Sequence, residues 1–210
     1  MNKADKNNAF TPKPRGGVHP LIMLAVPTLM TLSLASVLHF HQFEYIHQTI
    51  PNLLSNFVPE GKIPLALLGL QYVFTYYFTA FLAVFSRASF CNEGYNNNYP
   101  RRDKNLLTGI AARMQGAHEN TLEVFPAFAS AVIVGTICEI PQEKLIYFST
   151  CYNLARFGHT AVYACNVALP RSVLFHIGSM STLLIYLFSV VNNFDIYFQQ
   201  LCKHFLATPF

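Results

Sequence analysis

The sequence contains few charged residues and no tryptophan. Asp, Glu, Lys and Arg together make up 11% of its 210 residues, whereas an average soluble domain carries about 25%. So little charge excludes an ordinary nucleic-acid-binding domain, and we expect no nucleic-acid partner. Hydrophobic residues make up 52% of the chain and aromatic residues 14%, which excludes a disordered chain.

The sequence also lacks paired cysteine motifs. Its five cysteines are irregularly spaced and none forms a Cys-x-x-Cys pair, which argues against a zinc ribbon, a thioredoxin-type site or a disulfide framework. His39, His41 and His47 lie close together in sequence, but no carboxylate or cysteine completes a ligand set around them. We therefore predict no metal site.

Long apolar runs are the main feature that the sequence does contain. A helix of about 20 residues crosses a bilayer core of roughly 30 Å. The runs lack the alternation of barrel strands, so helices are the structure that they predict. The fold class is therefore an all-α, polytopic membrane bundle. Five runs are long enough, and they cover approximately residues 20–38, 63–86, 118–140, 145–166 and 172–191.

The basic residues are distributed unevenly between the predicted loops. If all five runs cross, ten Lys and Arg residues fall on one side, and only Lys62, Lys144 and Lys203 fall on the other. Basic loops stay in the cytoplasm, so we expect a multi-pass bacterial inner-membrane protein with a cytoplasmic amino terminus. Run 20–38 could alternatively be a cleaved signal peptide. We favour a retained helix, because the basic tail is long and no small-x-small cleavage signal follows.

Two predicted helices carry polar stripes that a lipid-facing helix would not have. A charge near the bilayer centre costs about 2.5 to 3.5 kcal/mol on insertion scales. Spacings of three or four residues place the members of each stripe on one helix face. The first stripe contains Arg113, Gly116, Asn120 and Glu123, and the second contains Asn153, Arg156, His159 and Tyr163. Arg171 and Ser172 follow at the next turn.

These stripes allow two interpretations. Glu123 and Arg156 could form a buried ion pair that fastens two helices, with Asn120 and Asn153 as interhelical hydrogen-bonding groups. Alternatively, the polar side chains converge on one cavity open to the basic side. Such a cationic cavity suits a small anionic ligand that carries carboxylates.

Two motifs carry a family resemblance. The segment "AHENTLEVFPAF", followed by "ARFGHTAVY" and "PRS", resembles the MAPEG family, the membrane-associated proteins in eicosanoid and glutathione metabolism. The loop "GYNNNYPR" is similar to the bacterial, largely uncharacterised branch. The resemblance implies a four-helix bundle that assembles as a homotrimer and binds glutathione between neighbouring subunits. It also implies a glutathione-dependent transferase or peroxidase that acts on lipophilic electrophiles arriving through the bilayer.

The resemblance assigns roles to residues by their position in these motifs. It implies that Arg171 and Ser172 activate the thiolate. The residues that match glutathione-binding positions are Arg113, Asn120, Glu123, Arg156, His159 and Tyr163.

The sequence departs from the family pattern at two of these places. Well-studied members carry arginines where this chain has Gly116 and Glu119. The loss of two positive charges weakens the expectation of glutathione binding. A non-catalytic membrane scaffold that keeps the fold without glutathione is therefore a second hypothesis.

The resemblance also suggests a division of the chain. We expect a cytoplasmic basic tail at 1–19, an extra transmembrane helix at 20–38 and an outer interfacial segment at 39–62. A four-helix domain follows at 63–193, and a tail at 194–210.

Overall fold

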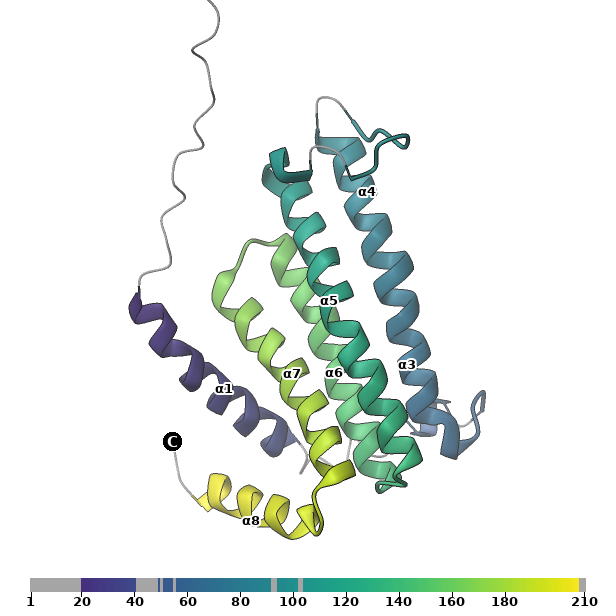
Figure 1. The fold of residues 1–210 in the computed structure, drawn as a ribbon, viewed down its shortest axis with the longest axis vertical. Helices are drawn as coiled ribbons and strands as arrows, with labels where there is room; N and C mark the ends of the chain where they lie inside the picture. The colour runs from purple at the N-terminus through teal and green to yellow at the C-terminus, as the bar shows by residue number, and fades with distance from the viewer. Residues whose placement is uncertain are drawn as a thin grey trace, which may run out of the picture.

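The structure, a computed structural model, describes residues 20–40, 49, 51–54, 56–91, 94–101 and 104–207. The predicted basic tail lies outside these residues, as do residues 41–48, 50 and 55 of the predicted outer segment, with His41 and His47 among them. The regular elements of the described residues are all helical, which confirms the predicted fold class (Figure 1). They are α1 (Pro20–Phe40), η1 (Glu60–Lys62), α3 (Ile63–Val73), η2 (Phe74–Phe78), α4 (Thr79–Phe90), η3 (Lys104–Leu106), α5 (Gly109–Ile137), α6 (Gln142–Ala164), α7 (Ala168–Val190) and α8 (Phe194–Ala207).

Within the part of the chain that the structure describes, three helices are long and apolar enough to cross a membrane. They are Ile63–Phe90, in which α3, η2 and α4 run on without a break, then α5 and α7. α6 lies alongside them in the bundle (Figure 1), so a bilayer that these helices cross also contains α6. α5 begins at Gly109, nine residues before its apolar run, because polar residues continue the helix beyond the apolar stretch that predicted it.

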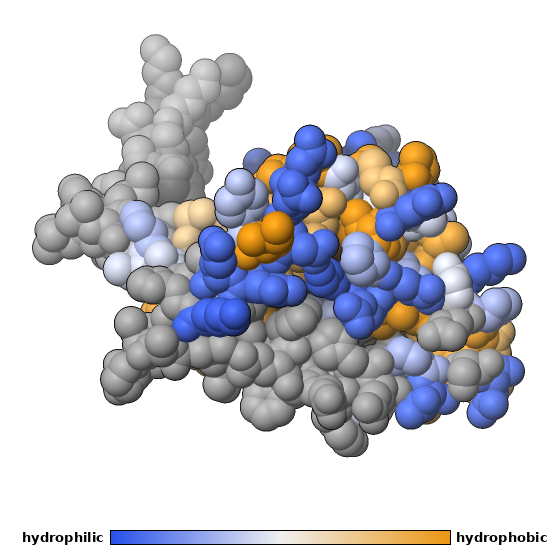
Figure 2. All heavy atoms as spheres, turned by 90° about the horizontal axis from the view of Figure 1, so that it is seen from below, coloured by the Kyte–Doolittle hydropathy of each residue, from blue (hydrophilic) through white to orange (hydrophobic). Residues whose placement is uncertain are grey.

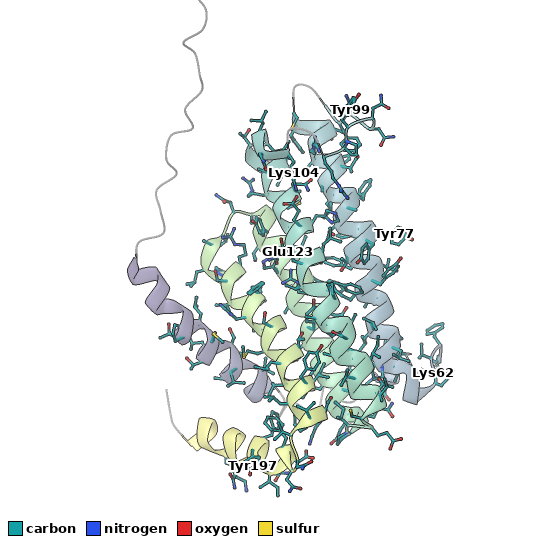
Figure 3. All side chains as sticks on the ribbon, viewed as in Figure 1. Lys62, Tyr77, Tyr99, Lys104, Glu123 and Tyr197 are labelled. Carbon is teal, nitrogen blue, oxygen red and sulfur yellow. The ribbon has the colours of Figure 1, made fainter. Side chains whose placement is uncertain are left out.

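The chain alternates in direction, so its connections gather at two ends of the bundle. Lys104, in the connection between α4 and α5, lies at one end of the bundle, and Lys62 lies at the other end (Figure 3). We call the first the loop end. Arg87 and Arg171 belong to elements that meet the loop end, whereas α8 crosses the opposite end. Seen from the α8 end, hydrophilic side chains cover much of the surface, with hydrophobic ones between and beyond them (Figure 2).

α6 forms the centre of the bundle. Every residue from 145 to 153 is buried, because α3, α5 and α7 all pack against this helix. Its sequence is the least apolar of the four long helices, and it is not among the three apolar spans. Polar side chains are tolerated in α6 because protein, not lipid, surrounds them. The rings of Tyr152 and Phe128 stack across the α5 contact, with centroids 3.7 Å apart.

A π-helical turn interrupts the first long helix. The Thr79 amide donates to the Phe74 carbonyl five residues back, which leaves the Thr75 carbonyl without its usual helical donor. The Thr79 hydroxyl fills that role and donates to the Thr75 carbonyl over 2.7 Å. Thr75 is fully buried and Thr79 is 1% exposed, so a side chain repairs the hydrogen bonding where water is excluded.

The ends of α5 and α6 close in the same way. Glu139 (φ 52°) and Asn166 (φ 61°) adopt the left-handed conformation just beyond the two helices. The following amides reach back, from Ile140 to the Gly135 carbonyl (3.2 Å) and from Val167 to the Val162 carbonyl (3.1 Å). These bonds satisfy terminal carbonyls and allow short turns between adjacent helices.

α1 and α8 attach to the outside of the four-helix core. The Tyr147 hydroxyl donates to the Val37 carbonyl of α1 over 2.6 Å, and the Ser33 hydroxyl donates to the Val173 carbonyl of α7 over 3.4 Å. Lys144 forms an ion pair with Asp195 of α8. The span predicted at 20–38 corresponds to α1, and its crossing of the membrane stays a prediction.

Substitution of Thr79 by valine is expected to lower the free energy of unfolding by about 1 to 3 kcal/mol, because the buried Thr75 carbonyl loses its donor. The measurement is a denaturant titration of detergent-solubilised protein. Thr136→Val is the matched control, because the Thr136 hydroxyl donates to the Val132 carbonyl over 2.8 Å at an exposed position. Equal losses for the two variants would contradict the role given to the π turn.

Candidate functional site

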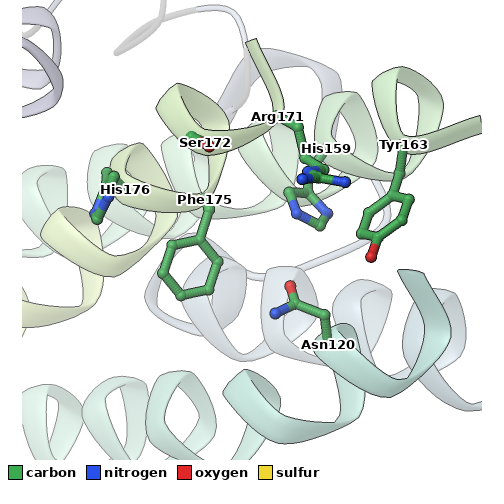
Figure 4. Close-up of a pocket in the computed structure, with 7 residues that line it drawn as sticks. All are labelled: Asn120, His159, Tyr163, Arg171, Ser172, Phe175 and His176. Atoms are coloured by element: carbon green, nitrogen blue, oxygen red, sulfur yellow. The ribbon is translucent and has the colours of Figure 1, made fainter. Parts of the chain in front are cut away.

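Five of the predicted site residues line one cavity near the loop end of α5, α6 and α7. The cavity has a volume of about 240 Å³. Its lining, shown in Figure 4, consists of Asn120, His159, Tyr163, Arg171, Ser172, Phe175 and His176. The predicted convergence of polar groups from α5 and α6 with the turn before α7 is therefore present in a single chain.

Arg156 lies behind the cavity and holds part of its wall. The side chain is 1% exposed, and its Nη2 donates to Asn120 Oδ1 over 2.7 Å. A second contact reaches Thr121 Oγ1 at 3.5 Å. Because the buried guanidinium fixes the amide oxygen, the Asn120 amide nitrogen is free to face the cavity, where it is a hydrogen-bond donor.

The positive charge inside the cavity comes from Arg171. Its guanidinium carbon lies 4.5 Å from the ring centroid of Tyr163, a distance that favours a cation–π contact. His159 packs edge-on against the same tyrosine, with ring centroids 5.5 Å apart. His159 is 3% exposed, and among the described residues its Nδ1 has no hydrogen-bond partner. A buried polar atom without a partner at a cavity wall is a position where a ligand can donate or accept a hydrogen bond.

Gly116 has a steric role that the sequence does not reveal. A Cβ atom at this position would lie 2.8 Å from the Tyr163 hydroxyl oxygen, closer than non-bonded atoms approach. The tyrosine therefore occupies the space that a larger residue at position 116 would take. An arginine at position 116 would therefore require Tyr163 to leave its place in the cavity wall.

Glu119 points away from this cavity. Its carboxylate pairs with Lys104 over 2.7 Å and accepts a hydrogen bond from Gln115 over 3.0 Å. Glu119 lines a different cavity, between α4 and α5. The acid at this position therefore adds no negative charge to the lining of the candidate site.

Besides Arg156, two predicted site residues are not part of the lining. Arg113 donates from Nε to the Ala164 carbonyl over 3.0 Å and so ties α5 to the end of α6. Glu123 is exposed on α5. The alternative of a buried Glu123–Arg156 ion pair is wrong, since the guanidinium of Arg156 bonds to Asn120 and Thr121 instead.

Phe175 and His176 line the cavity although the sequence reasoning missed them. His176 lies four residues after Ser172, and residues at this spacing share one face of a helix. The spacing could therefore have identified His176 as a neighbour of Ser172 in the site. Phe175 lies 5.9 Å from the guanidinium carbon of Arg156. Among the described residues, no group of three or more His, Cys, Asp and Glu side chains is placed to hold a metal ion.

Fold and site together define an integral membrane helical bundle with a polar cavity among its spans. Residues 63–191 match the profile of the MAPEG family. Because the match covers more than half of the chain, the protein belongs to the MAPEG family, membrane proteins of eicosanoid and glutathione metabolism, as the motifs predicted. No curated protein and no solved structure gives a significant match.

Replacing Asn120 by leucine is expected to lower the free energy of unfolding by about 1.5 to 3 kcal/mol, because a buried charged donor loses its acceptor. Asn120→Asp keeps an acceptor for Arg156 and should lose less. Denaturant titration of both variants in detergent makes the comparison. A leucine variant as stable as the wild type would show that Arg156 does not depend on Asn120.

Proposed function

We propose that this protein is a membrane-bound glutathione-dependent enzyme that acts on lipophilic electrophiles. The observation that carries the proposal is the convergence of Arg171, Tyr163, His159 and Asn120 on one cavity beside the membrane-spanning helices. Membership of the family makes glutathione the first ligand to test. We further propose that the loop end is cytoplasmic and that the membrane is a bacterial inner membrane.

The residues of the cavity fit an anionic, thiol-bearing ligand. Arg171 supplies a positive charge for a carboxylate or a thiolate, and Tyr163, Ser172 and the Asn120 amide supply donors. The orphaned Nδ1 atom of His159 offers a further contact. We assign Arg156 a positioning role, because it is buried and already bonded to Asn120.

Glutathione, when bound, would supply a thiol that attacks an electrophilic carbon or a peroxide oxygen. In this protein Arg171 would stabilise the thiolate by its positive charge. Ser172 would donate a hydrogen bond to the sulfur when its hydroxyl turns from the Ala168 carbonyl, to which it donates over 3.2 Å. We propose Arg171 and Ser172 as the catalytic pair.

We also propose that the functional unit is a homotrimer with each site completed by a neighbouring subunit. The cavity of one chain holds about 240 Å³, which is below the roughly 300 to 1,000 Å³ of ligand pockets. Glu123 is exposed on a span, where an ionised carboxylate facing lipid is costly. A second copy of the chain packed against this face would shield Glu123 from lipid. The Glu123 carboxylate would then lie at the edge of the ligand site.

The non-catalytic scaffold is the second candidate function. One observation favours this function: Tyr163 occupies the space that an arginine side chain at position 116 would need. Among the described residues, Arg171 is then the one arginine or lysine in the cavity lining of a single chain, although glutathione carries two carboxylates. Under this reading the cavity is a remnant and glutathione does not bind.

Arg171→Gln is expected to weaken glutathione binding at least about tenfold, because a charge-assisted contact is lost. The experiment is calorimetric titration of purified protein in detergent. Lys62→Gln removes the same charge from an exposed residue at the opposite end and should bind as the wild type does. Absence of binding by the wild type at millimolar glutathione would favour the scaffold.

Light scattering with correction for bound detergent is expected to give a protein mass three times the 23.7 kDa of one chain. Glu123→Gln keeps the size of the side chain at the proposed subunit contact and removes its charge, so the variant should remain a trimer and bind glutathione with changed affinity. A monomeric wild type that still binds glutathione would refute the shared site.

A further inference from the structure

The lining of the candidate site extends along α7 from the loop end into the membrane-spanning part of the bundle. Because a helix rises about 1.5 Å per residue, Arg171 and Ser172 lie about 5 to 6 Å from the first residue of α7, Ala168, whereas His176 lies about 12 Å from it. α7 is one of the helices that can cross a membrane. The cavity therefore has a shallow zone around Arg171 and a deeper zone that contains His176.

His176 is available to a molecule bound in the deeper zone. Its side chain is partly buried, and its ring lies edge-on to that of Phe175, with centroids 5.5 Å apart. Within the described part of the chain, His176 forms no hydrogen bond or ion pair. Figure 4 shows His176 and Tyr163 on opposite sides of the group of lining residues. The imidazole of His176 is therefore separate from the contact between Arg171 and Tyr163.

The other polar side chains of the lining are less suited to carry a proton into the deeper zone. An arginine such as Arg171 keeps its proton in proteins and cannot transfer it, and the described residues of the lining include no Asp or Glu. His159 is 3% exposed and packs on the Tyr163 ring in the shallow zone. Imidazole gains and loses a proton near neutral pH, so His176 is the group that can transfer a proton in the deeper zone.

The spacing of Ser172 and His176 matches the size of a reacting electrophile. The two residues are four apart on α7 and share a face, and residues at this spacing have Cβ atoms about 5 to 6 Å apart. The thiolate sulfur is proposed to lie beside Ser172. A three-carbon unit that the sulfur attacks at one end and that carries an oxygen at the other spans this interval, so its oxygen would face His176.

We propose that His176 is a further catalytic residue, which protonates the oxygen of an α,β-unsaturated carbonyl substrate while the thiolate adds to it. The inference rests on the proposed glutathione chemistry and names a class of lipophilic electrophile for it. A lipophilic molecule reaches the deeper zone from the bilayer side, where His176 lies, and the thiolate meets it from the shallow zone. A histidine placed to protonate a reacting group is a common general acid.

The proposed step balances in atoms and charge. The sulfur of the thiolate forms a bond to the β carbon, and the electrons of the carbon–carbon double bond shift toward the carbonyl, whose π pair moves to the oxygen. That oxygen takes a proton from the imidazolium of His176, and the resulting enol becomes the saturated carbonyl when a proton moves to the α carbon. The proton of the thiol is released to solvent, and solvent returns one proton to His176. The sum is the addition of a thiol across a double bond.

The test compares two electrophiles on the full chain in non-ionic detergent with glutathione as the thiol. Nonenal, an unsaturated aldehyde, develops negative charge on oxygen, whereas chlorodinitrobenzene loses chloride and needs no proton. His176→Gln keeps a polar side chain of similar length that cannot transfer a proton. We expect kcat with nonenal to fall at least about a hundredfold, the usual contribution of a general acid. The kcat with chlorodinitrobenzene and the KM for glutathione should stay at the wild-type values.

A second variant separates proton transfer from a structural role. Added imidazole should restore the turnover of nonenal by His176→Ala and not by His176→Gln, because only the alanine leaves room for the free base. Equal losses with both electrophiles in His176→Gln would show a structural role and overturn the proposal, and so would an unchanged kcat with nonenal. A wild-type protein that uses neither electrophile would instead refute the thiol chemistry on which the proposal rests.

Discussion

Burial of polar side chains at the centre of a membrane bundle is the constraint on which the rest of the structure depends. The guanidinium of Arg156 is 1% exposed, and a group of this kind is tolerated only with hydrogen-bond partners from protein. α5 supplies them through Asn120 and Thr121. The same contact that stabilises the pair of helices therefore sets the position of an amide in the candidate site.

The sequence was sufficient to predict the fold class and most of the spans. Apolar length placed the helices at 63–90 and 168–190 with errors of a few residues. Apolar length alone missed the start of α5, because the residues around Arg113 are polar, and only the predicted polar stripe assigned Arg113 to this helix. The central place of α6 was likewise hidden, since its polar composition is explained only once its neighbours are known.

The candidate site was predictable to the extent that helical periodicity defines a face. Asn120, His159 and Tyr163 were grouped correctly by spacing, and the cavity contains all three. Periodicity does not give the direction of a long side chain, so Arg113 was included although it reaches the end of α6 instead. Periodicity also does not predict contacts between different segments, such as those of Gly116 with Tyr163 and of Glu119 with Lys104.

The π turn in the first long helix has a consequence for register. Inward-facing residues before and after it recur every four positions, at Ile63, Leu67, Gln71, Thr75, Thr79, Ala83 and Arg87. A regular α-helix has about 3.6 residues per turn, so a strict spacing of four winds the inner stripe progressively around the helix. The wider turn takes up part of that winding. Loss of one residue between Thr75 and Thr79 would close this wide turn as a regular α-helical one, because the bond from the Thr79 amide to the Phe74 carbonyl would then span four residues. The inward faces on both sides would stay in register, and the Thr75 carbonyl would no longer depend on the Thr79 hydroxyl.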